Sequence, residues 1–273
     1  MPRIGSSPFA FPDFKGATRR LILLNLATYF ALLVMGFAFR EQVGGLILEL
    51  SLVPSLFVHG SIWQPLTYSL VHPGLLGTLI ELLSLWFLAG FFEMQGHSAS
   101  WVTGLYAVSV LGTAAAALAI FGVSATLHLD LQTIPLYGCF GGIFGLLAAI
   151  GFLYGDVQFM LFPLPIGIKA RYLAIIYALI SIAMLFGEQR MYAFAELGGA
   201  LAGLLWVRMA PRRGMSFMLS ESWYGMRNRY YRWKRRRAAR KFEVYMRSQG
   251  RTVRFDGQGR QIDEDSDDKK RWN

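Results

Sequence analysis

Three glutamates lie within long apolar stretches of the sequence, at Glu81, Glu93 and Glu196. Ionisable side chains are costly in an apolar environment, so each one marks a candidate functional site. Glu81 and Glu196 lie deepest, and if they meet they could share a proton or activate a water molecule for hydrolysis. An equally good interpretation is structural, with each carboxyl protonated and hydrogen-bonded to a neighbouring helix. Glu93 lies near the end of its stretch, where we expect it to hold a loop or a helix end.

The other reactive residue types form no recognisable site in the sequence. The histidines are His59, His72, His97 and His128, and no two are spaced as a metal-binding pair on a helix. Ser84 and Ser109 lie in apolar stretches that contain no histidine to activate them. Cys139 is the only cysteine, so it cannot form an internal disulfide. The sequence therefore predicts no metal site, no cofactor and no nucleophile–base pair.

The composition excludes an ordinary soluble enzyme. Of 273 residues, 54% are apolar and 16% are charged, whereas soluble domains have about 45–50% and about 25%. The net charge is +10, and almost all of the basic excess falls within 208–254. These values are typical of a polytopic membrane protein.

Six apolar stretches are long enough to cross about 30 Å of hydrocarbon. They cover roughly 21–39, 76–95, 100–121, 136–154, 172–187 and 191–208. The distribution of Lys and Arg places both termini in the cytoplasm of a plasma or inner membrane. The loop 40–75 then lies on the other side, where Trp63 and Tyr68 would suit the headgroup level.

Small residues recur in the fourth and sixth stretches. Gly141 and Gly145 in one, and Gly199 and Gly203 in the other, are each four residues apart. In lipid, such spacing marks faces where helix backbones approach closely. We expect these two helices to touch, and the alternative is two separate faces for dimerisation.

Four segments occur in an order that suggests a family. They are WQPLTYSLVHPG at 63–74, LWFLAGFFE at 85–93, FPLP at 162–165 and LGGALAG at 197–203. Over about 20–208 the chain resembles the rhomboid intramembrane proteases. The resemblance implies an all-α membrane protein with a bundle of six transmembrane helices, in which Glu93 is a structural glutamate.

The catalytic positions of that family have all changed here. The resemblance places Phe140 where rhomboids have the serine nucleophile and Glu196 where they have the histidine base. Gly77 and Glu81 stand at the positions of the histidine and asparagine of the oxyanion hole. Nucleophile and base act as a unit, so no catalytic residue is expected. Cys139 is not expected to replace the serine, because adjacent helical residues point about 100° apart.

The resemblance therefore implies a rhomboid pseudoprotease that binds transmembrane segments of client proteins, in trafficking, quality control or regulation. The alternative is an active intramembrane protease or hydrolase with a non-standard site at Glu81 and Glu196. In either case 1–19 is a cytoplasmic segment and 20–208 is the membrane domain. No cofactor is expected, and the client is not identified by the sequence.

The remaining segment, 209–254, is predicted to form a basic amphipathic cytoplasmic helix, followed by a disordered tail at 255–273. Trp223, Tyr230 and Trp233 form an aromatic stripe, and Arg235, Arg236 and Arg237 are among the basic residues around it. We expect this helix to bind anionic lipid headgroups of the bilayer. Contact with RNA or a ribosome is the competing interpretation.

Overall fold

The computed structural model describes residues 12–72, 74–127, 134–161, 166–210 and 215–250. The chain divides into two units, Met1–Met215 and Ser216–Asn273. The main helices of the first unit are α1 (Gly16–Ala38), α5 (Leu75–Met94), α6 (Ala99–Thr126), α7 (Phe140–Leu153), α8 (Ala170–Met184) and α9 (Arg190–Met209). Each of the six predicted apolar stretches overlaps one of these helices.

Three of the described helices, α1, α5 and α6, are long and apolar enough to cross a membrane. The helices α7 and α8 are also apolar but shorter. In α7 the predicted stretch begins at 136, whereas the helix begins at Phe140. Gly138 has a φ of +91°, a left-handed conformation that glycine adopts readily and that ends the preceding loop just before the helix.

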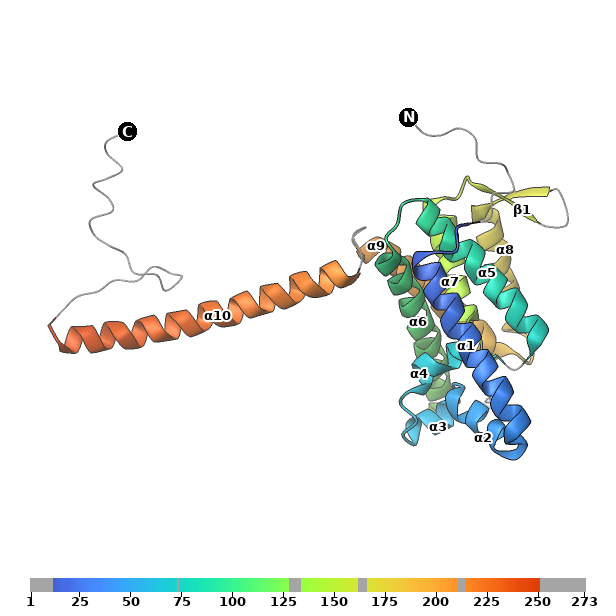
Figure 1. Ribbon diagram of the computed structural model, residues 1–273, viewed down its shortest axis with the longest axis horizontal. Helices are drawn as coiled ribbons and strands as arrows, with labels where there is room; N and C mark the ends of the chain where they lie inside the picture. The colour runs from blue at the N-terminus through green and yellow to red at the C-terminus, as the bar shows by residue number, and fades with distance from the viewer. Residues whose placement is uncertain (1–11, 73, 128–133, 162–165, 211–214, 251–273) are drawn as a thin grey trace. The chain divides into compact units, whose positions relative to one another are not determined.

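Short elements occupy the ends of the bundle (Figure 1). The segments α2 (Arg40–Leu50), α3 (Pro54–Val58), α4 (Gln64–Thr67) and η1 (Tyr68–Leu70) gather at the end where α1 finishes. At the opposite end, β1 (Gln158–Leu161) pairs in antiparallel register with β2 (Ile166–Lys169).

Tyr68 packs inside the bundle instead of presenting its ring to the surroundings of the protein. Its side chain is buried, and its hydroxyl donates a hydrogen bond of 2.8 Å to the carbonyl oxygen of Val110 on α6. Gln64 is also buried, and its Oε1 accepts a hydrogen bond from the backbone N–H of Val53. These bonds fold the loop into the bundle, because buried polar groups are stable only when they are paired. Trp63, in contrast, is 45% exposed.

The centre of the bundle consists of α6, α7 and α9, which pack closely on one another. A Cβ atom added to Gly199 would lie 2.6 Å from the carbonyl oxygen of Gly141. A Cβ atom added to Gly203 would lie 2.6 Å from the carbonyl oxygen of Gly145. The glycine faces of α7 and α9 therefore meet at backbone-to-backbone distance.

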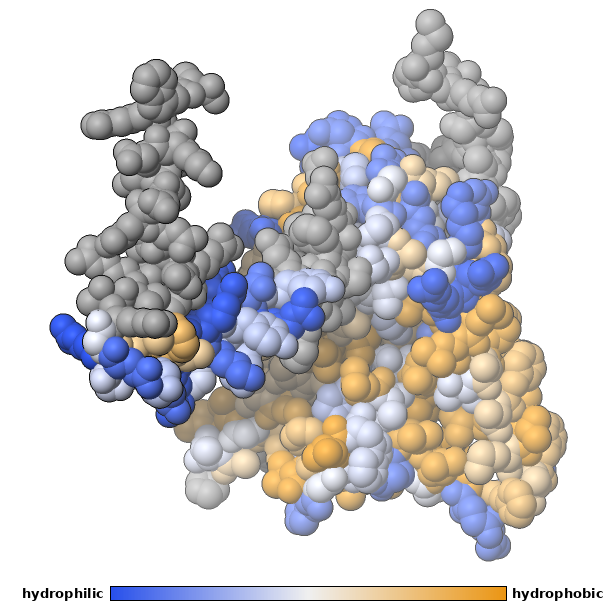
Figure 2. Space-filling view, turned by 60° about the vertical axis from the view of Figure 1, so that its left-hand side comes forward, coloured by the Kyte–Doolittle hydropathy of each residue, from blue (hydrophilic) through white to orange (hydrophobic). Residues whose placement is uncertain are grey.

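The outside of the first unit is mainly apolar. Figure 2 shows a broad hydrophobic surface on this unit, with hydrophilic residues gathered towards its ends. On α8 the buried residues are Ala170 and Ser181, and large apolar side chains such as Ile175 and Leu179 are exposed. A surface of this kind is stable in contact with lipid and not with water.

The second unit contains all of α10 (Met215–Ser248) except its first residue, and this helix lies within the segment 209–254 for which a basic amphipathic helix is predicted. Tyr230 and Trp233 are more than half exposed, and their rings are 6.3 Å apart. The guanidinium group of Arg237 lies over the Trp233 ring. The side chain of Trp223 and the predicted tail at 255–273 lie outside the described residues.

Candidate functional site

Three reactive side chains from separate segments meet inside the first unit. His72 lies between η1 and α5, Glu81 lies on α5, and Cys139 immediately precedes α7. All three residues are buried. One ligand atom of each, an imidazole nitrogen, a carboxylate oxygen and the thiol sulfur, lies within 4.8 Å of the other two. We refer to these residues as the His72–Glu81–Cys139 cluster.

The carboxyl group of Glu81 connects the cluster. Its Oε2 accepts a hydrogen bond of 2.6 Å from the backbone N–H of Cys139 and lies 3.3 Å from His72 Nε2. Gly138 permits this approach, because a Cβ atom at that position would lie 2.7 Å from Oε2. The Glu81 side chain is only 7% exposed and the His72 side chain only 1%. Water therefore has little access to either group.

The ring of His72 is oriented by a backbone hydrogen bond. Its Nδ1 lies 3.1 Å from the carbonyl oxygen of Leu70. A carbonyl oxygen can only accept, so Nδ1 carries the hydrogen. In the neutral ring Nε2 is then unprotonated, and this buried atom has no hydrogen-bond partner in the described part of the chain.

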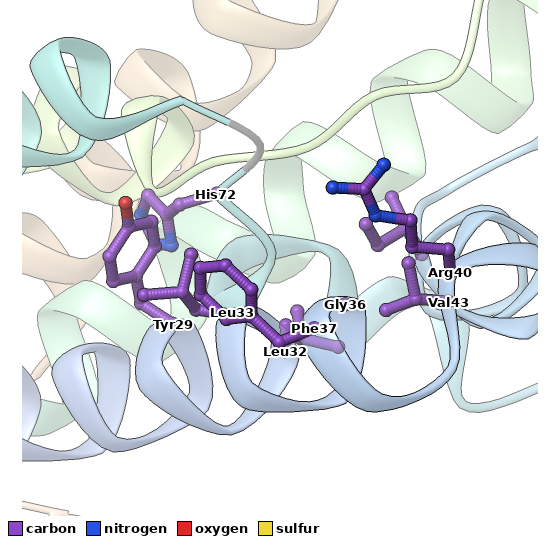
Figure 3. Close-up of a pocket in the computed structure, with 9 residues that line it drawn as sticks. Tyr29, Leu32, Leu33, Gly36, Phe37, Arg40, Val43 and His72 are labelled. Atoms are coloured by element: carbon purple, nitrogen blue, oxygen red, sulfur yellow. The ribbon is translucent and has the colours of Figure 1, made fainter.

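A cleft of about 270 Å³ reaches His72 from the outside. Its walls come from α1 and α2, with Tyr29, Leu33 and Phe37 on α1 and Val43 on α2. Figure 3 shows His72 and Tyr29 at one end of this cleft and Arg40 and Val43 at the other. The cleft thus connects the surface between α1 and α2 with one member of the cluster.

Glu196 has a different partner. Its Oε2 accepts a hydrogen bond of 2.6 Å from the hydroxyl of Ser181 on α8. Glu81, in contrast, bonds to Cys139 and faces His72. Among the described contacts the two carboxyls share no hydrogen-bond partner, so the geometry gives no support to a two-carboxyl site.

The two other positions at which rhomboids have catalytic groups carry no reactive side chain. Phe140 is the first residue of α7, and its side chain is 39% exposed. Gly77 is exposed on α5, and a Cβ atom there would contact nothing within 4 Å. Neither position supplies a nucleophile or a hydrogen-bond donor from its side chain.

Glu93 holds the beginning of α1. Its Oε1 accepts a hydrogen bond of 2.6 Å from the backbone N–H of Ala17, and its Oε2 accepts one of 2.8 Å from the Thr18 hydroxyl. Nearby and outside the apolar helices, Lys15 donates a hydrogen bond of 2.7 Å to Asp13. This hydrogen bond and the Asp13 charge, with a smaller contribution from the charge of Glu93, raise the pKa of Lys15 above its ordinary value.

The cluster as a whole could not be predicted from the amino-acid sequence. Its members are separated by 9 residues between His72 and Glu81 and by 58 between Glu81 and Cys139. Metal-site patterns depend on short, fixed spacings, which these three residues do not have. Only the burial of Glu81 in an apolar stretch marked one member in advance.

The sequence pattern of one protein family covers most of the chain. The family described as eukaryotic integral membrane protein (DUF1751) matches residues 22–214, a range that contains α5, α6, α7, α8, α9 and most of α1. No curated protein is significantly similar to the chain. The match agrees with the apolar surface and with the helices that are long enough to cross a bilayer. The chain is an integral membrane protein and belongs to this DUF1751 family.

Proposed function

We propose that this protein is a rhomboid-like bundle of six membrane-crossing helices that binds transmembrane segments of client proteins and does not cleave them. The main support for the proposed lack of cleavage is that Phe140, which cannot act as a nucleophile, is the first residue of α7. Next to it, the backbone N–H of Cys139 already donates to Glu81. A donor that is occupied in this way cannot also stabilise the oxyanion of an acyl-transfer reaction.

The base position supports the same proposal. Glu196 receives a hydrogen bond from Ser181 on α8, and no reactive hydroxyl or thiol on α7 is among its described partners. General-base catalysis requires the base to be within hydrogen-bond reach of the proton that it removes. The alternative function is hydrolysis by Glu81 and Glu196 acting together. It is less well supported, because the described contacts give the two carboxyls no common hydrogen-bond partner.

Client binding is supported by the helices on either side of α7. Both α5 and α8 pack against α7, whereas α5 and α8 are not among the described helix pairs that pack closely. On α5, Leu76, Leu79 and Ile80 are more than half exposed. In lipid a client helix with a polar residue is poorly solvated, so replacing lipid by a protein surface with polar groups nearby stabilises it.

The topology belongs to the same proposal. Both termini are placed in the cytoplasm, because Lys169 and Arg171 and the basic segment 208–254 then lie on the cytoplasmic side. The cytoplasmic segment 1–19 and the extension after 208 flank the membrane domain.

Crosslinking to a defined helix tests client binding. A photocrosslinking amino acid is placed at Phe140, or at Leu24 on α1 as a control that is also exposed. The protein is reconstituted in vesicles with a labelled transmembrane peptide that has a central asparagine, or with an all-leucine peptide. We expect the asparagine peptide to be captured from position 140 and not from position 24. Equal capture from both positions would contradict client binding, and cleavage of the peptide would support the hydrolase instead.

A further inference from the structure

His72 and Glu81 bring two hydrogen-bond acceptor atoms close together in the buried interior of the first unit. With Nδ1 bonded to Leu70, the neutral ring has its unshared electron pair on Nε2, and this atom lies 3.3 Å from Glu81 Oε2 without forming a hydrogen bond to it. Both atoms are acceptors in the neutral imidazole and the carboxylate. Two lone pairs at this distance repel each other unless a cation lies near both.

We propose that the His72–Glu81–Cys139 cluster binds a divalent transition-metal ion of the zinc class. Imidazole nitrogen, carboxylate oxygen and thiolate sulfur are the three ligand types that zinc uses in proteins. The hydrogen bond from His72 Nδ1 to a backbone carbonyl is also the usual way in which a metal-binding histidine is oriented. A proton between His72 and Glu81 would balance those two groups but would give the thiol no role.

The charge balance fits the apolar surroundings. A divalent cation held by one thiolate, one carboxylate and one neutral imidazole has no net charge. Buried unpaired charges are strongly unfavourable, whereas a neutral ion–ligand set is stable in such a site. All three residues are at most 6% exposed, so the ion and its ligands together must carry no net charge.

The distances require only a small adjustment. In tetrahedral zinc sites, bonds of about 2.0–2.3 Å place the ligand atoms about 3.3–3.5 Å from one another. The ligand atoms of the cluster lie within 4.8 Å of one another before any ion is present. A side-chain movement of about 1 Å would therefore complete the set. Three protein ligands leave a fourth coordination position open, and the cleft along α1 and α2, which is lined at one end by His72, supplies an entry path for the ion.

Cobalt substitution tests the site directly. The full chain is purified in detergent without a polyhistidine tag, and Co²⁺ is added. A cobalt–thiolate bond gives a charge-transfer absorption that no nitrogen or oxygen ligand produces. We expect this band at about one equivalent of Co²⁺, and we expect Zn²⁺ to remove it by displacement. Absence of the band in the folded wild-type protein would overturn the proposal without the need for any variant.

Matched variants assign the ligands. Cys139→Ser should abolish the band, and His72→Gln should weaken binding by at least about tenfold, since losing even an outer-shell partner costs about 10–100-fold in affinity. His59→Gln is the control, because His59 is exposed and lies outside the cluster. Circular dichroism and gel filtration establish that each variant is folded. Unchanged zinc content in folded Cys139→Ser, or an equal loss in His59→Gln, would place the ion elsewhere and overturn the proposal.

Discussion

Glu93 connects two segments that are 75 residues apart in the sequence. A helix begins with backbone N–H groups that have no partner within the helix, and the Glu93 carboxyl accepts one of them, from Ala17. It also accepts the hydroxyl of Thr18, which is fully buried. A negative charge at the positive end of a helix dipole adds to the effect. The carboxyl therefore fixes the start of α1 against the end of α5.

Replacing this carboxyl should destabilise the protein measurably. We expect Glu93→Ala to lower the free energy of unfolding by about 1–3 kcal/mol, because two part-buried donors lose a charged acceptor. Thermal unfolding of the protein in detergent measures the change. Glu188→Ala serves as the control, because Glu188 is exposed and should be neutral. Equal melting temperatures for the two variants would mean that the Glu93 contacts contribute nothing to stability.

The position of a glutamate in an apolar stretch of sequence predicts that it needs a polar partner, but it does not predict which residue that partner is. It marked Glu81, Glu93 and Glu196 as residues that need partners, and each of them has partners in the structure. It could not name those partners, because they come from distant segments such as Cys139 and Ser181. The same limit explains why the spacing of the histidines did not single out His72.

At the level of the helices, the contact between α7 and α9 depends on missing side chains. Gly145 and Gly203 approach so closely that a Cβ atom on Gly203 would lie 2.7 Å from the Cα atom of Gly145. Such contacts replace the hydrophobic driving force, which is absent between helices in lipid. The apolar stretches also predicted where the helices lie, because the thickness of the hydrocarbon core sets the length of apolar sequence that a membrane-crossing helix needs. They did not predict the short elements of 40–75, whose positions depend on bonds to other parts of the chain.

A single added methyl group should disturb this interface. We expect Gly199→Ala to lower the free energy of unfolding by about 1–3 kcal/mol, the usual cost of overpacking. The matched control is Gly44→Ala on α2, where a Cβ atom would contact nothing within 4 Å. There the substitution should be neutral or slightly stabilising, because alanine favours helices over glycine. Thermal unfolding of both variants makes the comparison, and the opposite order of stability would refute the close approach.

Taken as a whole, the molecule combines a unit with an apolar surface and a unit with a basic helix. The first unit has its exposed large side chains where lipid would contact them, as on α5 and α8. In the second unit the aromatic residues Tyr230 and Trp233 remain more than half exposed on α10. Exposed aromatic rings next to arginines are costly in water, and they are typical of helices that lie in the headgroup region. The helical pattern of this segment could be recognised in the sequence because it is local.

The binding preference of α10 can be measured with a peptide of residues 220–246. We expect it to gain helicity on vesicles that contain anionic lipid, since each basic residue near the surface adds about 1 kcal/mol of attraction. Raising the salt concentration should release it, because screening shortens the range of the attraction to about 8 Å at physiological ionic strength. Replacing Arg235, Arg236 and Arg237 by glutamine should weaken binding to anionic vesicles and leave the weak binding to neutral vesicles unchanged. If the peptide binds neutral vesicles equally well, charge is not the cause. If it binds RNA more tightly than lipid, the basic face serves nucleic acid, and the aromatic residues would then stack on bases instead of entering the headgroup region.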